Sequence, residues 1–232
     1  MVVVPDVSSC DDISRNRCAV AAAILGKRSG RMRVMTLAHG TEQIESARLV
    51  LRRIEPGDLP FFTRIHSVAD VVRYTGHGRP RSAEETQAWL QATIASYEQL
   101  ELGQLAVSRK ADGALLGRCG LSDLVIETNP AANTLPRAWF GRSQAPAGLA
   151  VDQERELGYT FDAAQWGQGY ATEAALCVFA YERDVLKRGR VISVIDGNNV
   201  RSQRVAERCG LRRQGGPIDV LGRRLDVYVW PT

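Results

Sequence analysis

The sequence predicts a single α/β or α+β domain over about residues 45–232, without internal repeats. Predicted strands and helices follow one another along it in the order β-α-α-β-β-β-α-β-α-β-β. Hydrophobic residues make up 44% of the 232 residues and charged residues 24%, as in ordinary globular chains. The β-branched run VISVI at 191–195 predicts a strand buried inside a sheet.

The first half of the domain contains a strand, two helices and a hairpin. RLVLRRI (48–54) has the apolar alternation of a strand. Pro56 to Asp58 opens a helix, and Ser82 with Glu85 forms a capping box that starts a second one. Two further strands flank an Ala-Asp-Gly turn and form a hairpin; they span 104–110 and 115–121.

A long connection and a second group of elements complete the domain. Residues 127–153 are rich in Pro, Ala, Gly and Asn, and we expect a functional or disordered loop there. The elements that follow are a strand at 155–161, a helix at about 169–186, a strand at 191–195, a helix around 202–208 and strands near 211–214 and 224–230.

Residues 1–44 differ from the rest and are expected to form an N-terminal extension. They mix Ser, Asp, Arg, Gly and Ala without sustained periodicity. Three interpretations stay open: a disordered tail or a start placed too early, with Met35 as the alternative start; a functional tail; or a targeting segment. Arg15 and Arg17 precede a short apolar run, but acidic residues upstream weigh against targeting.

Composition argues against several kinds of partner. The net charge is +4, but six basic and three acidic residues fall within 1–34, so the domain is almost neutral and no nucleic-acid partner is expected. Five scattered cysteines and three histidines indicate no metal site. The longest apolar run has eight residues, so no membrane partner is expected. We expect a cytoplasmic monomer or homodimer.

The stretch QWGQGYATEAA (165–175) places two glycines between a strand and a helix. The first N–H groups of a helix lack internal partners, and the helix dipole adds partial positive charge. Without side chains, Gly167 and Gly169 would let phosphate oxygens approach these groups. A plain turn is the alternative on this evidence alone. Thr172 stands where a dinucleotide-binding fingerprint needs Gly or Ala.

Several segments together resemble the GCN5-related N-acetyltransferase (GNAT) superfamily, and most closely its ribosomal-protein-alanine acetyltransferase branch. They are ELGYTF, WGQGYATEAA and NNVRSQRVAERCGL, supported by RLVLR and by residues 71–90. The resemblance covers about residues 45–230. It implies a central mixed, mostly antiparallel twisted sheet of about six or seven strands, flanked by about four helices.

The resemblance also implies acetyl-CoA as co-substrate. Its pyrophosphate would lie on the amides of 167–172, and its pantetheine arm would pair with the strand 157–161. The implied cofactor-binding residues are Tyr159, Thr160, Phe161, Trp166, Gly167, Gln168, Gly169, Tyr170, Ala171, Thr172, Asn199 and Ser202. Trp166 occupies a position where the wider family has Arg or Gln.

Acetyl transfer to an amine by direct attack needs a group that takes the amine proton and a group at the sulfur. By resemblance, Ser202 is the general acid or a hydroxyl that contacts sulfur, although it could simply cap the last helix. Glu156 would be the base, acting through water, although a charge at a strand edge or a salt bridge is the alternative. Asp123 is a less favoured candidate base.

The expected function is acetyl-CoA-dependent N-acetylation of a primary amine, either a protein N-terminus or a small molecule. Two alternatives stay open: a CoA-binding regulatory or interaction module without catalysis, and an antibiotic-modifying acetyltransferase. An aminoglycoside acceptor would need an acidic cleft, and the loop 127–153 holds few acids. Within that loop, Trp139 and Phe140 either wall the acceptor site or anchor the loop.

Overall fold

The computed structural model describes residues 33–36, 42–98 and 103–230. The strands in these ranges are β1 (Arg33–Thr36), β2 (Glu42–Glu45), β3 (Leu49–Arg53), β4 (Gln104–Arg109), β5 (Leu115–Glu127), β6 (Arg137–Phe140), β7 (Val151–Phe161), β8 (Val191–Asp196), β9 (Arg212–Arg213), β10 (Ile218–Val220) and β11 (Arg223–Trp230). The α-helices are α1 (Leu59–His66), α2 (Ala69–Val72), α3 (Ala83–Ser96), α4 (Tyr170–Asp184) and α5 (Val200–Arg208). Short 3-10 turns lie at Pro56–Asp58, Arg142–Gln144 and Ala163–Gln165.

All these strands belong to one sheet. Among the described residues, only the pairs β6–β10 and β7–β8 are parallel. The predicted mixed, mostly antiparallel sheet is therefore confirmed. The described strands outnumber the six or seven predicted. The additional strands are short: β1, β2, β6, β9 and β10 have two to four residues each. Runs that short carry little periodicity for a sequence pattern to reveal.

The long strand β5 organises the sheet, because it pairs with β4, β6 and β7. From β6 the pairing continues through β10, β11 and β8 and returns to β7, so six strands close into a ring. All of these strands except β7 contribute to a buried apolar cluster of Leu124, Ala138, Ile192, Ile218, Val220, Leu225 and Val229. This cluster fixes the ring at one end of the sheet.

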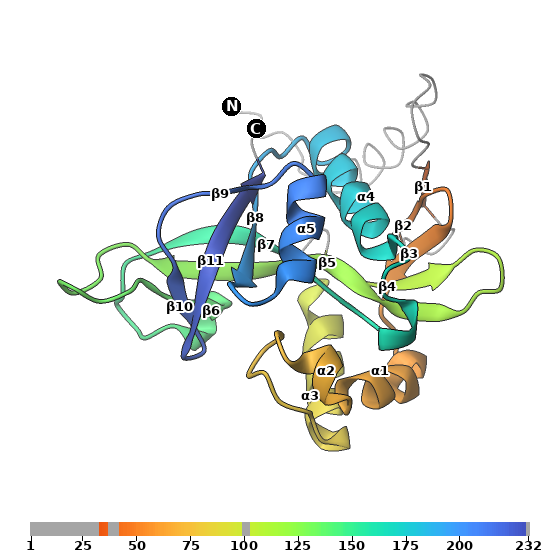
Figure 1. Cartoon of the computed structure of the whole chain (residues 1–232), viewed down its shortest axis with the longest axis horizontal. Coiled ribbons are helices and arrows are strands. Elements are labelled where there is room, and N and C mark those ends of the chain that lie inside the picture. The colour runs from red at the N-terminus through yellow and green to blue at the C-terminus, as the bar shows by residue number, and fades with distance from the viewer. Residues whose placement is uncertain (1–32, 37–41, 99–102, 231–232) are drawn as a thin grey trace, which may run out of the picture.

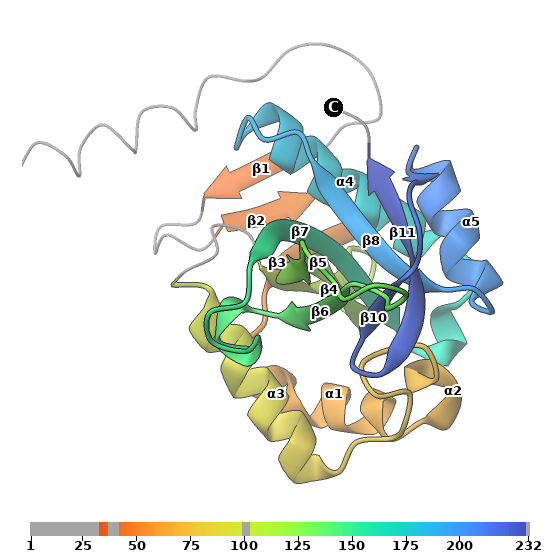
Figure 2. The ribbon, with the colours of Figure 1, turned by 90° about the vertical axis from the view of Figure 1, so that its left-hand side faces the viewer.

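Helices cover both faces of the sheet. Helices α1–α3 lie together on one side and α4 lies on the other (Figures 1 and 2). Phe62, Ile65 and Leu90 anchor the first layer, and Ala174, Val178 and other residues of α4 pack against the opposite face. The described residues contain five α-helices rather than about four, since Val68 takes an extended conformation and separates α2 from α1.

The prediction of one long loop over residues 127–153 is wrong. β5 continues past its predicted end to Glu127, β6 follows, and β7 begins at Val151. Val125 faces Trp139 in the antiparallel register, and the Arg137 guanidinium bonds the buried Glu127 carboxylate at 3.0 Å. The predicted capping box is confirmed, because Ser82 and Glu85 bond each other's backbone N–H groups.

Two strands fall largely within the predicted extension. β1 pairs with β2, and β2 pairs with β3, so the described sheet begins at Arg33. Ile44 is completely buried against α4 and the strands that it covers. The remainder of residues 1–44 lies outside the described residues, and an extension there stays a prediction.

Candidate active site

The strands β7 and β8 lie parallel but share a single register pair, Glu156 with Ile192. Beside this pair, the Ser193 hydroxyl donates to the Leu157 carbonyl at 2.9 Å. Further along, β7 stays paired with β5 and β8 stays paired with β11, so the two strands diverge. The β7 edge that faces the opening, residues 158–161, can therefore offer backbone groups to a ligand.

A cavity of about 900 Å³ opens where the strands diverge. We call it the large cavity. Eleven of the twelve predicted cofactor-binding residues line it: Tyr159, Thr160, Phe161, Trp166, Gly167, Gly169, Tyr170, Ala171, Thr172, Asn199 and Ser202. Gln168 does not line it, because its carbonyl accepts a bond from Arg48 at 3.0 Å and its amide turns back to the Ala164 carbonyl. The Thr160 hydroxyl is buried and has no hydrogen-bond partner among the described residues.

The glycine turn brings the N-terminus of α4 to this cavity. Gly167 and Gly169 have φ of 78° and 81°, a left-handed conformation that favours glycine. Gly169 is the N-cap of α4 and supplies no capping side chain. The first-turn carboxylate, Glu173, instead bonds Ser46 at 2.6 Å and Arg48 at 2.7 Å. Uncapped amides and the helix dipole therefore favour an anion at this end of the cavity.

Trp166 fixes the glycine turn in place. Its indole N–H donates to the Phe161 carbonyl at 3.0 Å, which ties the turn to the end of β7. The Arg201 guanidinium lies 4.6 Å from the Trp166 ring centroid, a cation–π contact from α5. In this position Trp166 connects three elements that line the large cavity.

The large cavity has a positively charged lining. Arg201, Arg204 and Arg208 follow one another at helical spacing along α5, and all three line the cavity. Arg73 adds a fourth guanidinium, and its ion pair with Asp70, at 2.5 Å, is exposed. A lining with four arginines and one carboxylate favours an anionic ligand.

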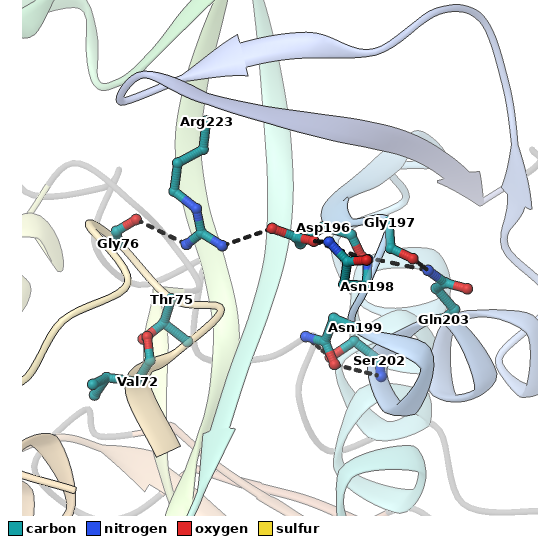
Figure 3. Close-up of polar contacts among 10 residues, drawn as sticks. All are labelled: Val72, Thr75, Gly76, Asp196, Gly197, Asn198, Asn199, Ser202, Gln203 and Arg223. Atoms are coloured by element: carbon teal, nitrogen blue, oxygen red, sulfur yellow. Dashed lines mark hydrogen bonds and ion pairs between the residues drawn. The ribbon is translucent and has the colours of Figure 1, made fainter. Parts of the chain in front are cut away.

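Asn199 and Ser202 form a bonded pair at the start of α5 (Figure 3). The Asn199 side chain accepts from the Ser202 N–H at 3.2 Å and donates to the Ser202 hydroxyl oxygen at 2.9 Å. Asn199 is therefore the N-cap, and Ser202 is already inside the helix. A hydroxyl that accepts this bond can still donate its own proton. The Tyr159 hydroxyl donates to the Ser202 carbonyl at 3.1 Å, which joins β7 to α5.

A second cavity of about 140 Å³ adjoins the first, and we call it the small cavity. It lies against strands of the ring and the loop after α2. Five residues line both cavities: Tyr74, Thr75, Tyr159, Asn199 and Ser202. Ser202 and Asn199 thus stand at the junction of the two spaces.

Glu156 lines the small cavity and is only 7% exposed. Burial raises the pKa of its carboxyl to about 7, against the opposing influence of Arg118 and a backbone bond from Val194. The carboxylate lies over Gly158, where an added Cβ would be 3.2 Å from Glu156 Oε2. This is a buried side chain, not an exposed charge at a strand edge. Asp123 accepts from Gln153 at 2.7 Å and lines neither cavity.

Sequence reasoning missed most of the small cavity. Arg118 donates to Gln104 Oε1 at 2.5 Å, and Gln104 donates in turn to Ser122 Oγ at 3.1 Å. All three line the small cavity with Glu156. Phe140, for which the sequence left open a role in the acceptor site or as a loop anchor, lines it too. Cross-strand register brings these residues together, and a single strand's sequence carries no signal of it.

Arg223, which lines the small cavity, lies between Gly76 and Asp196 (Figure 3). Its guanidinium bonds the Asp196 carboxylate at 2.9 Å and the Gly76 carbonyl at 3.2 Å. Asp196 ends β8, whereas Gly76 belongs to the loop after α2. The bridge therefore holds that loop, with Tyr74 and Thr75, over both cavities.

The described cysteines are packed in the core. Burial raises the pKa of the Cys209 thiol to about 12 and that of Cys177 to about 11. In the part of the chain that the structure describes, no group of three or more His, Cys, Asp or Glu side chains is arranged to hold a metal. No helix in that part has the length and apolar character to span a membrane; the longest, α4, has 15 residues.

Known proteins resemble this chain over most of its length. The Bacillus subtilis (strain 168) protein YkkB, itself uncharacterised, is 26% identical over 76% of this chain and 92% of its own. An acetyltransferase structure from Agrobacterium tumefaciens str. C58 has a TM-score of 0.61 at 21% identity, covering 89% of this chain and all of that one. The structure of RimL, a ribosomal L7/L12 alpha-N-protein acetyltransferase in complex with coenzyme A, has a TM-score of 0.58 at 15% identity and covers 81% and 94%.

The family comparison agrees with the fold and with the sequence resemblance. The family model described as an acetyltransferase (GNAT) domain matches residues 48–212. That range includes β7, the glycine turn, α4 and α5, the elements that enclose the large cavity. The chain belongs to the GNAT acetyltransferase family.

Proposed function

We propose that this protein transfers the acetyl group of acetyl-CoA to a primary amine by direct attack. One observation carries the proposal: two cavities meet at Ser202 and Asn199, one with an uncapped helix N-terminus and the other with a buried carboxylate. The large cavity would hold acetyl-CoA, and the small cavity would hold the acceptor. The domain doing this would span residues 45–232 with the strands β1 and β2 attached.

The residues of the large cavity suit coenzyme A. Its pyrophosphate would lie on the amides of Gly167 to Thr172, near the arginines of α5. Its pantetheine arm would run along the β7 edge at 158–161, where backbone groups face the divergence from β8. The Thr160 hydroxyl, which has no partner among the described residues, offers a further polar contact. When bound there, acetyl-CoA supplies an activated thioester.

Glu156 in the small cavity and Ser202 at the junction would handle the protons. Glu156, through a water molecule, takes one proton from the amine while the nitrogen bonds to the acetyl carbon and the carbon–sulfur bond breaks. The Ser202 hydroxyl donates a hydrogen bond to the departing sulfur, which leaves as a thiolate and takes a proton from water. Asn199 holds the Ser202 hydroxyl in position. With a pKa of about 7, Glu156 is well matched to a base at neutral pH.

The two alternative functions receive less support. A polycationic antibiotic needs several carboxylates, but the acids lining the small cavity are Glu156 and Asp196, and Asp196 is paired with Arg223. A CoA-binding module without catalysis would have no use for a buried carboxylate that lines the same cavity as Ser202, since burying a charge costs stability.

The test is a screen with radiolabelled acetyl-CoA against small amines and short peptides with free N-termini. We expect label to appear on at least one amine and coenzyme A to be released in equal amount. Tight binding of acetyl-CoA without transfer to any amine would overturn catalysis and favour the binding module.

A further inference from the structure

The small cavity contains a guanidinium that amine acetylation alone does not require. Arg118 projects from β5 into this cavity, on the same face of the sheet as Glu156. Its one hydrogen bond among the described residues goes to the neutral Gln104 side chain. Its Nε is buried and has no partner in the described part of the chain. A half-buried guanidinium whose Nε is buried without a partner among the described residues favours an anionic partner.

The surroundings of Arg118 add positive charge. The guanidiniums of Arg118 and Arg81 lie 5.4 Å and 5.7 Å from the Trp89 ring centroid. Arg81 also has a buried nitrogen without a hydrogen-bond partner among the described residues. His66, which contacts the same ring, is held neutral because burial lowers its pKa to about 3. The corner therefore holds two guanidiniums; the carboxylate that acts on Arg81 is Glu85, which is itself paired with Arg79.

The carboxylates of the small cavity do not fully neutralise this corner. Asp196 is committed to Arg223 at 2.9 Å. Glu156 interacts electrostatically with Arg118, but burial still raises the pKa of its carboxyl to about 7, and this carboxyl must exchange a proton during the proposed reaction. The small cavity therefore has a proton-accepting end at Glu156 and a fixed positive end at Arg118, with Gln104 and Ser122 between them as hydrogen-bonding groups.

Resting on the proposed function, we infer that the acceptor is a small amine that also carries a carboxylate, as a free amino acid does. Its amino group would face Glu156 and Ser202, and its carboxylate would receive hydrogen bonds from Arg118. The volume of about 140 Å³ suits a molecule of this size. A guanidinium that bonds the carboxylate of one acceptor discriminates against amines that lack it, because it would otherwise stay unpaired.

The experiment compares matched acceptors at fixed acetyl-CoA: a set of L-amino acids, their carboxamides, the corresponding amines without the carboxyl group, and tripeptides that begin with the same residue. We expect kcat/KM for the best amino acid to exceed that for its carboxamide by about 10- to 100-fold, as charge-assisted bonds allow. In Arg118→Gln the preference should shrink towards unity through a higher KM for the amino acid, while the carboxamide is little affected.

Arg118→Lys and Arg64→Gln are the comparison variants. Arg118→Lys keeps the charge and should restore part of the preference. Arg64→Gln removes a guanidinium that pairs with Asp162 outside both cavities, so the preference should stay as in the wild type. Thermal stabilisation by coenzyme A reports that each variant is folded. If Arg118→Gln does not fold, the comparison of each amino acid with its carboxamide in the wild-type protein tests the inference about the acceptor.

The outcomes separate the two proposals. If no amine in any set is acetylated, the proposed function fails. If amines are acetylated but amino acids and carboxamides react equally well, or if tripeptides are preferred over free amino acids, the function stands and the inference about the acceptor is overturned. A preference that survives intact in folded Arg118→Gln would also overturn the assignment of Arg118.

Discussion

The two cavities are lined by different kinds of chemical group. The large cavity presents backbone groups of a glycine turn and a helix N-terminus, together with arginines on one face of α5. The small cavity presents side chains from several strands of the ring, above all the buried Glu156 and the half-buried Arg118. Backbone amides bind phosphate whatever else varies, whereas side chains can be exchanged one at a time. The comparison teaches that recognition of coenzyme A and choice of acceptor are separable in this fold.

The largest expected effect comes from Glu156→Gln, which removes the base from the small cavity. We expect turnover to fall by about 10²- to 10⁴-fold while binding of acetyl-CoA is unchanged. In the wild type, kcat/KM should rise as pH increases through about 7, because only the ionised carboxylate accepts a proton. Steady-state rates from pH 5.5 to 9 measure both effects. The pH dependence that remains in Glu156→Gln reports the ionisation of the acceptor itself.

A residual rate within about threefold of the wild type, with the same dependence on pH, would remove Glu156 from the mechanism. Calorimetric titration with coenzyme A is the control for the large cavity. A matched loss of binding there would contradict the separation of the two cavities.

The same substitution should change the pH dependence of stability. Burial raises the folded-state pKa of Glu156 from the ordinary 4.5 to about 7. Below pH 4.5 the folded and unfolded chains both hold the proton, and above 7 both lose it. The group's contribution to the free energy of unfolding is therefore lost as pH rises between these values, by about 3 kcal/mol. Urea unfolding should show this loss in the wild type and not in Glu156→Gln, which would become the more stable chain at pH 8.

A smaller effect is expected from Gly158→Ala. The new Cβ would lie 3.2 Å from Glu156 Oε2 and 3.5 Å from Gln104 Nε2, so the carboxylate must shift. We expect kcat to fall by roughly 10-fold, since small displacements of a reacting group are costly, with little change in coenzyme A affinity. The control is Gly57→Ala, where an added Cβ meets nothing within 4 Å. Equal effects of the two substitutions would mean that Glu156 is not held by this contact.

The sequence predicted the large cavity better than the small one, for a physical reason. The predicted cofactor-binding residues fall in three short segments. Two of these segments contain the starts of α4 and α5, whose conformations are determined locally by the glycines and by Asn199. The exception, Gln168, faces Arg48, which is 120 residues away. The roles of Ser202 and Glu156 in catalysis stay predictions.

The small cavity depends on contacts that a linear pattern does not contain. Arg118 looked like an ordinary polar residue of a hairpin strand, and its cation–π contact arises because α3 brings Trp89 against it. Phe140 enters the small cavity because β6 pairs with β5 and β10. Strands of three or four residues leave almost no periodic signal, so the ring that places these side chains was not predicted.

The most direct test of the two-cavity account is coenzyme A binding by Gly169→Trp, measured as the shift in melting temperature on adding the ligand. Gly148→Trp is the matched control, because Gly148 has a similar φ of 75° and lines neither cavity. The account predicts that both variants fold, that Gly148→Trp keeps the wild-type shift, and that Gly169→Trp loses it. A wild-type shift in folded Gly169→Trp would contradict the assignment of the glycine turn as the phosphate site.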